Sequence, residues 1–593
     1  MHDINDKSEQ SGYYMNFSLD VDIIKNMLSA KVLYGLNKEN TSRDSYIPSD
    51  VYYALQRKSR GNLGYGKRQQ STLEGTLTFQ HKFGELLDMN LMAGMGRYLD
   101  SGDGSDISYE NANDHIQGSS VGMADGPFYP TSYKYKNEKR SQFVRGNFDL
   151  LGRYVVSASL RRDGTDKFFP SKKYALFPSV SLAWKMNEES FIKNISWINM
   201  LKLRASYGET GSDNLGTTLY GIVTTTREDV QFNNNSVTYI PYILSGANYE
   251  DVTWQKTVMK NIGLDFSVLR DRIWGSVDVF RNDVTHLLGT APTELLGMHG
   301  TRPINGGHYK RTGVDVSLNS LNLQTHDFKW TSQITLSHYN AVWIERMPNY
   351  DYQKYQKRKN EPMNAFYYYK TTGIINVDKS NMPESQRSLG PAACMPGYPI
   401  VEDKNGDGII DVNDSYMDNT LPKLYFGFGN TFTWKNFDLD IFMYGQLGVK
   451  KWNDAYGNSI DVGGLSRGVD AHNVGIYSYN IWNTQTNTNG RFPGIAISKS
   501  VALPENLGFD YTRENASYIR VRNITLGYNL GPKELSVFKG YIRGIRVFVD
   551  FQNPLTFTKY KGYDPEINTS SSNLTGGQYP QMRVYSIGAK LTF

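Results

Sequence analysis

Residues Ser71–Phe83 read STLEGTLTFQHKF, and their apolar side chains recur at every second position. Leu73, Leu77, Phe79 and Phe83 fall on one side of an extended chain, whereas threonine, glutamate, glutamine and lysine occupy the other. Successive side chains of a β-strand point to opposite faces, so this segment has one apolar face and one polar face. The pattern predicts a β-strand and disfavours an amphipathic helix.

The same alternation runs through the whole chain, and helical periodicity is nearly absent. In 517–530 the apolar positions change parity after Val521, which predicts a β-bulge or a buried inner face. The alternation predicts seventeen strands: 13–19, 29–36, 71–83, 86–99, 140–150, 153–162, 174–186, 199–208, 258–269, 272–282, 308–319, 327–339, 422–434, 437–447, 517–530, 543–552 and 582–593.

The links between these strands alternate between short and long. Links such as 84–85, 151–152 and 435–436 are short, whereas 100–139 and 340–421 are long. Structureless stretches beyond about 15 residues are uncommon in compact soluble domains. Transmembrane β-barrels, in contrast, have short periplasmic turns and long extracellular loops. The sequence therefore predicts an all-β protein, namely a transmembrane antiparallel β-barrel with long extracellular loops and short periplasmic turns.

The final strand supports this fold class. Tyr585, Ile587, Ala589, Leu591 and the terminal Phe593 share one face, and polar or small residues occupy the other. This ending resembles the C-terminal signal by which bacterial outer-membrane barrels are recognised for assembly. The sequence thus predicts a multi-pass β-barrel in the bacterial outer membrane, with lipid against its apolar face.

The strand count predicts a barrel larger than this chain. Bacterial single-chain barrels have an even number of strands, and an open sheet edge cannot stand in lipid. If the last strand ends at the periplasm, counting back makes the first strand, 13–19, run toward the periplasm as well. In a barrel of about 22 strands, five would then be missing and this chain would begin at the sixth. We therefore expect the C-terminal part of a larger barrel.

The composition excludes several other classes of protein. The 593 residues include 64 Lys and Arg against 59 Asp and Glu, without a basic tract, so nucleic acid is not an expected partner. No apolar run approaches the roughly 18 residues of a membrane-spanning helix. The single cysteine, Cys394, excludes internal disulfides. Since no nucleophile motif lies in a strand-turn-helix context, we do not expect an enzyme.

The sharpest local motif, DKNGDGIIDVND at 403–414, lies in the long loop 340–421. Its oxygen-bearing residues follow the spacing of an EF-hand calcium loop, with Gly408 at the sharp turn and a backbone carbonyl contributed by position 409. Asp414 replaces the usual glutamate, and no helices flank the loop. A solvated turn is the alternative. The predicted Ca²⁺ ligands are Asp403, Asn405, Asp407, Ile409, Asp411 and Asp414.

The same loop contains the aromatic run Phe366–Tyr369. Aromatic rings stack on sugars, so a glycan site is one interpretation, whereas packing within the loop is the other and the one we favour. The substrate-binding residues therefore stay unknown at this level.

Several segments resemble the barrel of SusC/RagA-type TonB-dependent outer-membrane transporters, and the resemblance runs from about Tyr13 to Phe593. The matching segments are Leu160–Phe169 (LRRDGTDKFF), Phe177–Trp184 (FPSVSLAW), Ala205–Asn214 (ASYGETGSDN), Asn248–Thr257 (NYEDVTWQKT), Asn261–Phe266 (NIGLDF), Tyr425–Leu439 (YFGFGNTFTWKNFDL), Ser517–Tyr528 (SYIRVRNITLGY), Val549–Pro554 (VDFQNP) and Tyr560–Glu566 (YKGYDPE).

The resemblance implies a 22-stranded barrel with an N-terminal plug. It also implies TonB as the energy-coupling partner, bound through an N-terminal part that this sequence does not contain. A SusD-like surface lipoprotein would cap the barrel, and the pair would import oligosaccharides or peptides. Residues 1–593 would form the C-terminal part of the barrel domain, and 340–421 a long extracellular loop.

Two alternatives of other classes stay open. One is a non-transporting barrel remnant or surface glycan-binding β-protein, and the other is a soluble secreted β-protein that binds or cleaves polysaccharide. The regular alternation of link lengths counts against the soluble protein.

Overall fold

The structure is a computed structural model of the chain. It describes residues 4–49, 58–112, 121–215, 224–226, 232–234, 237–239, 242–244, 250–292, 301–348, 352–357, 360–453, 479–494, 503–511, 513–538, 541–562, 564–567 and 580–593.

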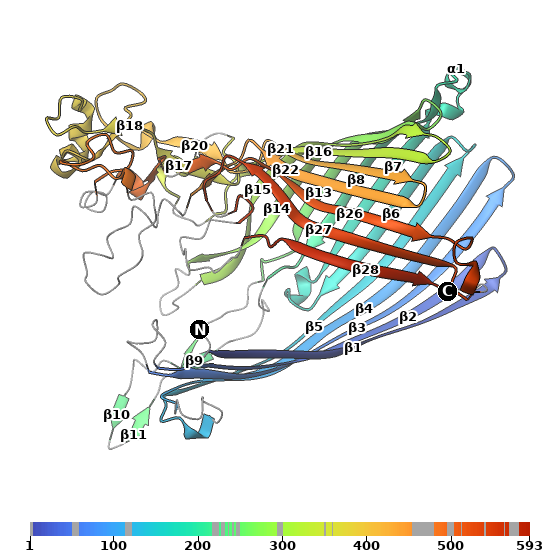
Figure 1. Cartoon of the computed structure of the whole chain (residues 1–593). Helices are drawn as coiled ribbons and strands as arrows, with labels where there is room; N and C mark the ends of the chain where they lie inside the picture. The colour runs from blue at the N-terminus through green and yellow to red at the C-terminus, as the bar shows by residue number, and fades with distance from the viewer. Residues whose placement is uncertain are drawn as a thin grey trace.

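Seventeen long strands form one antiparallel sheet that curves round a central space (Figure 1). Each strand pairs with the long strands that precede and follow it in the chain. The strands are β1 Asn5–Ile24, β2 Leu28–Ile47, β3 Arg60–Phe83, β4 Leu87–Glu110, β5 Phe128–Leu150, β6 Tyr154–Thr165, β7 Tyr174–Lys185, β8 Ile198–Ser212, β13 Gln255–Val268, β14 Ile273–Pro292, β15 Thr301–Gln324, β16 Phe328–Glu345, β21 Leu424–Trp434, β22 Phe437–Leu447, β26 Tyr518–Leu530, β27 Gly544–Thr558 and β28 Val584–Thr592. All seventeen predicted strands are confirmed.

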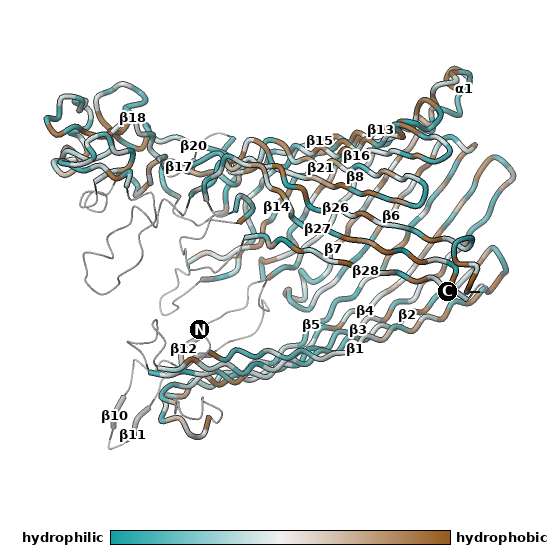
Figure 2. Tube along the Cα trace, viewed as in Figure 1, coloured by the Kyte–Doolittle hydropathy of each residue, from teal (hydrophilic) through white to brown (hydrophobic). Residues whose placement is uncertain are grey.

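The register places apolar residues of successive strands side by side. Leu182 of β7 lies opposite Ala205 of β8, which lies opposite Ile262 of β13, which lies opposite Val279 of β14. The three large side chains of this row are exposed in the isolated chain, Leu182 by 52%, Ile262 by 62% and Val279 by 58%. Figure 2 shows apolar and polar residues alternating along the strands. We call the face that carries this row the outward face, because a barrel in lipid turns its apolar side outward.

The opposite, inward face carries charged side chains that pair with one another. On β8 and β13, Arg204 donates to Asp265 at 2.7 Å and Lys202 lies 3.0 Å from the same carboxylate. Arg204 also reaches Asp278 of β14 at 3.0 Å. Three neighbouring strands thus share one ion-pair network, as expected for a polar barrel interior.

Aromatic side chains gather on the outward face next to the short turns. Tyr154 lies opposite Trp184, and Trp434 lies opposite Phe437, which in turn lies opposite Tyr528 on its other side. Such a girdle is typical of the level where a barrel meets lipid headgroups. It marks one edge of the apolar band.

Several strands are longer than the sequence pattern predicts, and the largest extensions lie at the end of the long loops. The link predicted at 37–70 contains the ends of β2 and β3, and the link at 100–139 contains the ends of β4 and β5. Beyond the apolar band both faces are polar, so the alternation disappears. The backbone ladder continues there, because it depends on N–H and C=O groups and not on side chains.

The predicted irregularity after Val521 is confirmed as a β-bulge. The register shifts between Val521 and Asn523 on the β27 side, and opposite Phe442 and Met443 on the β22 side. Arg522 is the extra residue, so the outward parity of β26 changes at this point.

The sheet has two edges. In the described part of the chain, β1 pairs only with β2 and β28 only with β27. The predicted seventeen strands are therefore all present, and the five further strands of a complete barrel stay a prediction.

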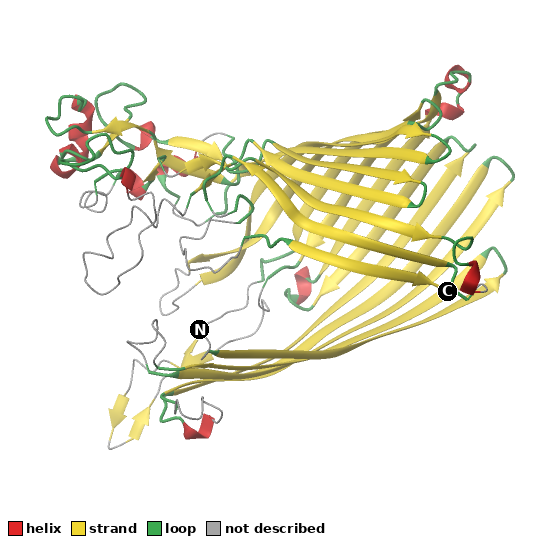
Figure 3. Ribbon diagram, in the orientation of Figure 1, coloured by secondary structure: helices red, strands yellow, loops and turns green. Residues whose placement is uncertain are grey.

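The remaining elements lie in the links (Figure 3). The one described α-helix, α1 Ser190–Lys193, follows β7 at the short-turn end. No helix in the described residues is long and apolar enough to cross a membrane. The short strands are β9 Thr224–Thr226, β10 Phe232–Asn234, β11 Val237–Tyr239, β12 Tyr242–Leu244, β17 Ala365–Tyr369, β18 Thr371–Ile374, β19 Pro399–Val401, β20 Tyr416–Asn419, β23 Lys450–Trp452, β24 Gly508–Phe509 and β25 Arg513–Asn515.

The assignment of the two faces predicts that an arginine substitution has different effects on stability at two neighbouring residues of β13, Ile262 and Asn261. We expect Ile262→Arg on the outward face to destabilise the protein by about 1–2 kcal/mol, the cost of an arginine inside the apolar band between its middle and its outer edge. Asn261→Arg on the inward face keeps its charge in water and is the matched control. The measurement is the amount of folded protein in the outer-membrane fraction. Equal losses for both variants would contradict the assignment of the faces.

Candidate functional site

Parts of the long links fold together into a small body at the end of the sheet opposite α1 (Figure 1). We call this body, formed by residues 360–421 and 503–516, the loop platform. β17 pairs antiparallel with β20 and parallel with β24, and β18 pairs with β19. We call the 17-stranded sheet the wall. The parallel β17–β24 pair joins two links that are separated in the chain by two strands of the wall, β21 and β22. The platform is thus a unit of structure and not two independent loops.

Two apolar clusters lie inside the platform. One contains Tyr369, Val401, Ile410 and Leu503, and the other contains Ile375, Ala393, Tyr398 and Ile400. Leu503 brings the second long link into the first cluster. Burial of these side chains stabilises the platform by the hydrophobic effect.

The aromatic run Phe366–Tyr369 belongs to this interior. Tyr367 and Tyr368 are less than a tenth exposed, and Tyr369 is fully buried. The Tyr369 hydroxyl donates to the backbone carbonyl of Asp411 at 3.0 Å. These rings therefore pack within the platform, and they present little surface on which a sugar could stack.

A charge cluster lies beside these rings. The Arg513 side chain is only 5% exposed and donates to Asp418 at 2.8 Å, while its guanidinium lies 4.3 Å from the centre of the Phe366 ring. Lys450 also lies 3.2 Å from Asp418. Burial alone would raise the pKa of Asp418, but the hydrogen bond from Lys450 and the two positive charges outweigh it and lower the pKa. The carboxylate thus holds two links together in its charged form.

The predicted calcium loop is described in full. Asp403 accepts hydrogen bonds from the N–H groups of Gly406 and Gly408 at 2.7 and 2.9 Å. Asn405 accepts from the N–H of Asp407 at 3.1 Å, and Asp407 accepts from that of Ile409 at 2.9 Å. The chain therefore turns through successive side-chain-to-backbone hydrogen bonds.

The second half of the loop is held by Asp414. Its carboxylate is fully buried and accepts from the N–H of Lys404 at 2.9 Å and from that of Asp411 at 2.8 Å. Asp411 in turn caps the short 3₁₀ turn Val412–Asp414. Asp414, the last residue of the motif, is thus tied to Lys404, the second residue.

The six predicted ligands share one loop, but their side chains do not converge as a metal site. In the described residues no group of three or more His, Cys, Asp or Glu side chains is placed to hold a metal ion. The hard oxygen donors suit Ca²⁺ in kind and spacing. Their carboxylates accept backbone N–H groups in this structure, so calcium binding stays a prediction.

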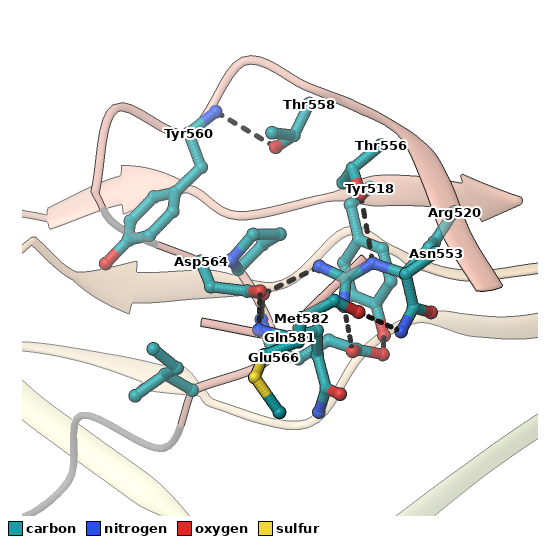
Figure 4. A network of polar contacts seen from close by, with 12 residues as sticks. Tyr518, Arg520, Asn553, Thr556, Thr558, Tyr560, Asp564, Glu566, Gln581 and Met582 are labelled. Atoms are coloured by element: carbon teal, nitrogen blue, oxygen red, sulfur yellow. Dashed lines mark hydrogen bonds and ion pairs between the residues drawn. The ribbon is translucent and has the colours of Figure 1, made fainter. Parts of the chain in front are cut away.

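A second polar site, which the sequence reasoning missed, joins the last long link to the wall (Figure 4). Arg520 of β26 is buried and donates to Asp564 at 2.8 Å and to Glu566 at 2.6 Å. Its Nε also donates to the Thr556 hydroxyl at 3.0 Å, and the Tyr518 hydroxyl donates to Glu566 at 2.6 Å. We call this network the Arg520 clamp.

The clamp fixes both sides of the link between β27 and β28. Asp564 accepts from the N–H of Gln581, 17 residues further on, at 3.0 Å. Lys451 adds a second anchor by donating to the carbonyls of Pro565 and Ile567. Burial lowers the pKa of Lys451, partly opposed by Glu566 and Asp564. The sequence does show two acidic residues in the segment Tyr560–Glu566. It does not show that they pair with Arg520 of β26, because that contact depends on the folded structure.

The chain matches known proteins over most of its length. The sequence model of the family described as "TonB dependent receptor-like, beta-barrel" matches residues 1–553. The TonB-dependent receptor P3 of Formosa agariphila is 26% identical over 99% of this chain and 58% of that protein. The TonB-dependent receptor SusC of Bacteroides thetaiotaomicron is 28% identical over 78% of this chain and 44% of that protein. The chain thus spans about half the length of these curated relatives.

The fold is similar to a solved structure as well. The structure titled "Structure of the RagAB peptide transporter" superposes with a TM-score of 0.80, 21% identity, and coverage of 100% of this chain and 63% of that one. At this identity the similarity concerns the fold.

The clamp predicts the effect of removing its guanidinium. We expect Arg520→Met to free the segment 559–567 from the wall, because Asp564 and Glu566 then lose the guanidinium that pairs with both of them. Breaking a buried ion pair costs about 3–5 kcal/mol. Limited proteolysis measures the release, and cleavage in this link is expected to accelerate at least about tenfold.

The matched control for the clamp is Arg522→Met. Arg522 is the exposed bulge residue two positions away on the same strand. If both variants resist protease as well as the parent protein, the clamp does not hold the link.

Proposed function

Because the chain belongs to the family of TonB-dependent receptor-like β-barrels, we propose that the protein takes part in the TonB-dependent import of oligosaccharides or peptides. It is an outer-membrane protein of the SusC/RagA type and not an enzyme. The observation that carries the proposal is the family match over residues 1–553, which covers nearly the whole wall. The cargo and the partners are the parts that we propose.

The inward face supports a polar cargo. A cavity of about 710 Å³ lies against β5 to β8 and β13 to β15, and Ser157, Ser159, Ser179, Ser181 and Asn261 are among its lining residues. The hydroxyls of Ser159 and Ser179 lie 2.7 Å apart and bond to each other. Hydroxyl and amide groups bind sugar hydroxyls and peptide groups equally well, because both are donors and acceptors.

The charges on the inward face support the same reading. Lys202 and Arg204 are paired with Asp265 and Asp278, and Lys185 lies 2.7 Å from Asp149. Arg145 and Arg311 also line the cavity, so the wall offers cationic groups as well as hydroxyl and amide groups to a cargo.

The partners follow from the family and from the position of the loop platform. The curated relatives are named TonB-dependent receptors, and TonB is therefore the proposed source of energy. We place a SusD-like surface lipoprotein over the outer end of the barrel, where the platform projects (Figure 1). The packed platform offers such a lid a shaped surface, which a mobile loop would not.

The proposed import predicts a growth and uptake phenotype. We expect deletion of the gene in the source bacterium to abolish uptake of one class of oligosaccharide or peptide, and the intact gene to restore it. The measurement is accumulation of fluorescently labelled oligosaccharides and peptides in parallel. Deletion of TonB is the matched control and should give the same loss.

Two outcomes would contradict the proposal. Uptake that persists without this protein would remove the import function. Binding of a glycan at the cell surface with no TonB-dependent uptake would instead favour the alternative of a non-transporting surface glycan-binding protein.

We further propose that the loop 403–414 binds Ca²⁺. Four carboxylates and one amide occupy EF-hand positions, and the chain already turns between Asp403 and Asp414 as such a loop requires. Ca²⁺ would stiffen the edge of the platform, where Glu402 also pairs with Lys370 at 2.8 Å. The hydrogen bond from Lys370 lowers the pKa of Glu402, so this second tie persists at neutral pH.

Calcium binding predicts a change in protease sensitivity. EDTA is expected to speed cleavage within 403–414, and Asp403→Asn with Asp411→Asn should do the same without EDTA. Asp378→Asn is the control, because Asp378 lies in the same link and accepts only from its neighbour Ser380. Unchanged cleavage with EDTA, together with no calcium in elemental analysis of the protein, would refute the site.

A further inference from the structure

A row of polar and basic side chains borders the apolar band on the outward face. Tyr207 of β8 lies opposite Lys260 of β13, and Lys260 lies opposite Arg281 of β14, while the apolar Val180 of β7 lies on the other side of Tyr207. This row follows directly after the row of Leu182, Ala205, Ile262 and Val279, two residues further toward the long loops. Two cationic side chains, Lys260 and Arg281, therefore lie at the outer edge of the apolar band that faces lipid.

The height of this row corresponds to the outer headgroups. Lys260 lies eight residues from the end of β13 at Val268, and Arg281 lies eight residues from the start of β14 at Ile273. Eight residues of strand span about 27 Å, or about 20 Å along the axis of a barrel whose strands tilt by about 40°. The apolar band of such barrels is about 25 Å tall, so both side chains reach its outer edge.

Two like charges directly opposite each other are unfavourable in a sheet. Arg281 is satisfied by Asp283, to which it donates two hydrogen bonds of 2.9 Å. For Lys260 the described part of the chain supplies no carboxylate and no hydrogen-bond partner, and its side chain is exposed. The sheet thus holds a bare ammonium next to a guanidinium at the level of the lipid headgroups.

The surroundings of Lys260 are positive overall. The outward positions around it on β8, β13, β14 and β15 carry two carboxylates, Glu209 and Asp283, which pair with Lys256 and Arg281 respectively. Lys310, opposite Asp283 on β15, adds a further cation. This local excess of positive charge would attract an anion from outside the protein.

A shallow groove of about 520 Å³ runs below these cations. Its lining includes Leu182, Ala205, Ile262 and Val279, and Lys260 and Arg281 close its outer end. The small side chain of Ala205 between larger neighbours leaves room for an acyl chain. The apolar floor of the groove suits an acyl chain, and its cationic end suits an anionic headgroup, since basic residues next to a membrane attract such headgroups.

We propose that this surface binds a phosphate-bearing lipid of the outer leaflet, with an acyl chain along the Ala205 row and the phosphate between Lys260, Arg281 and Lys310. The lipid supplies the missing negative charge and fixes the protein at one depth in the outer leaflet. This binding is independent of cargo import.

The test compares phosphatidic acid with phosphatidylcholine on the detergent-purified protein. Native mass spectrometry counts the lipids that stay bound as the ratio of the two is varied. The parent protein is expected to retain phosphatidic acid preferentially, and Lys260→Met with Lys310→Met to lower that preference at least fivefold. Lys25→Met with Lys193→Met, which removes two exposed lysines at the short-turn end of the sheet, is the charge-matched control.

A second variant tests the groove without changing a charge. Ala205→Phe fills the floor while keeping the outward face apolar, and it should weaken retention of both lipids at this site. Equal preference for phosphatidic acid in the parent and the double lysine variant would overturn the proposal. A loss in the lysine variant without any change in Ala205→Phe would overturn the acyl-chain position.

Discussion

Backbone hydrogen bonding in a medium without water is the constraint on which the rest of the structure depends. Every N–H and C=O group of a strand in lipid needs a partner on a neighbouring strand. The seventeen strands meet this demand through sixteen consecutive antiparallel pairings between neighbours in the chain, except along the outer edges of β1 and β28. Once that ladder exists, the strict alternation of side chains separates an apolar outward face from a polar inward face.

The same hydrogen-bonded sheet also positions the loop platform and the Arg520 clamp at the long-loop end. Strands that continue beyond the apolar band carry the links to a common level, where two of them pack as the loop platform. Arg520 shows how tightly wall and loop are joined, because its guanidinium belongs to β26 and its carboxylate partners to the following link. Buried ion pairs and apolar clusters thus give the loops at this end a fixed shape.

The sequence pattern predicts the strands of the wall but not the fold of the loop platform. All seventeen strands and the bulge after Val521 follow from side-chain alternation, which is a local signal. Strand ends beyond the apolar band were missed because nothing in their side chains alternates. The β17–β24 pair and the Arg520 clamp join residues that are far apart in sequence, and only the register brings them together. The ligand set 403–414 was located as one loop, but whether its oxygens gather round Ca²⁺ depends on side-chain rotations that spacing does not determine.

The most direct test of the central claim is accessibility along β13. Cys394, the only cysteine, is replaced by serine, and single cysteines are then placed at residues 259–266. The account predicts a period of two, in which a water-soluble thiol reagent labels 261, 263 and 265 while only a lipid-soluble reagent labels 262, 264 and 266. Uniform labelling by the water-soluble reagent at all of these positions would contradict a wall with one face in lipid.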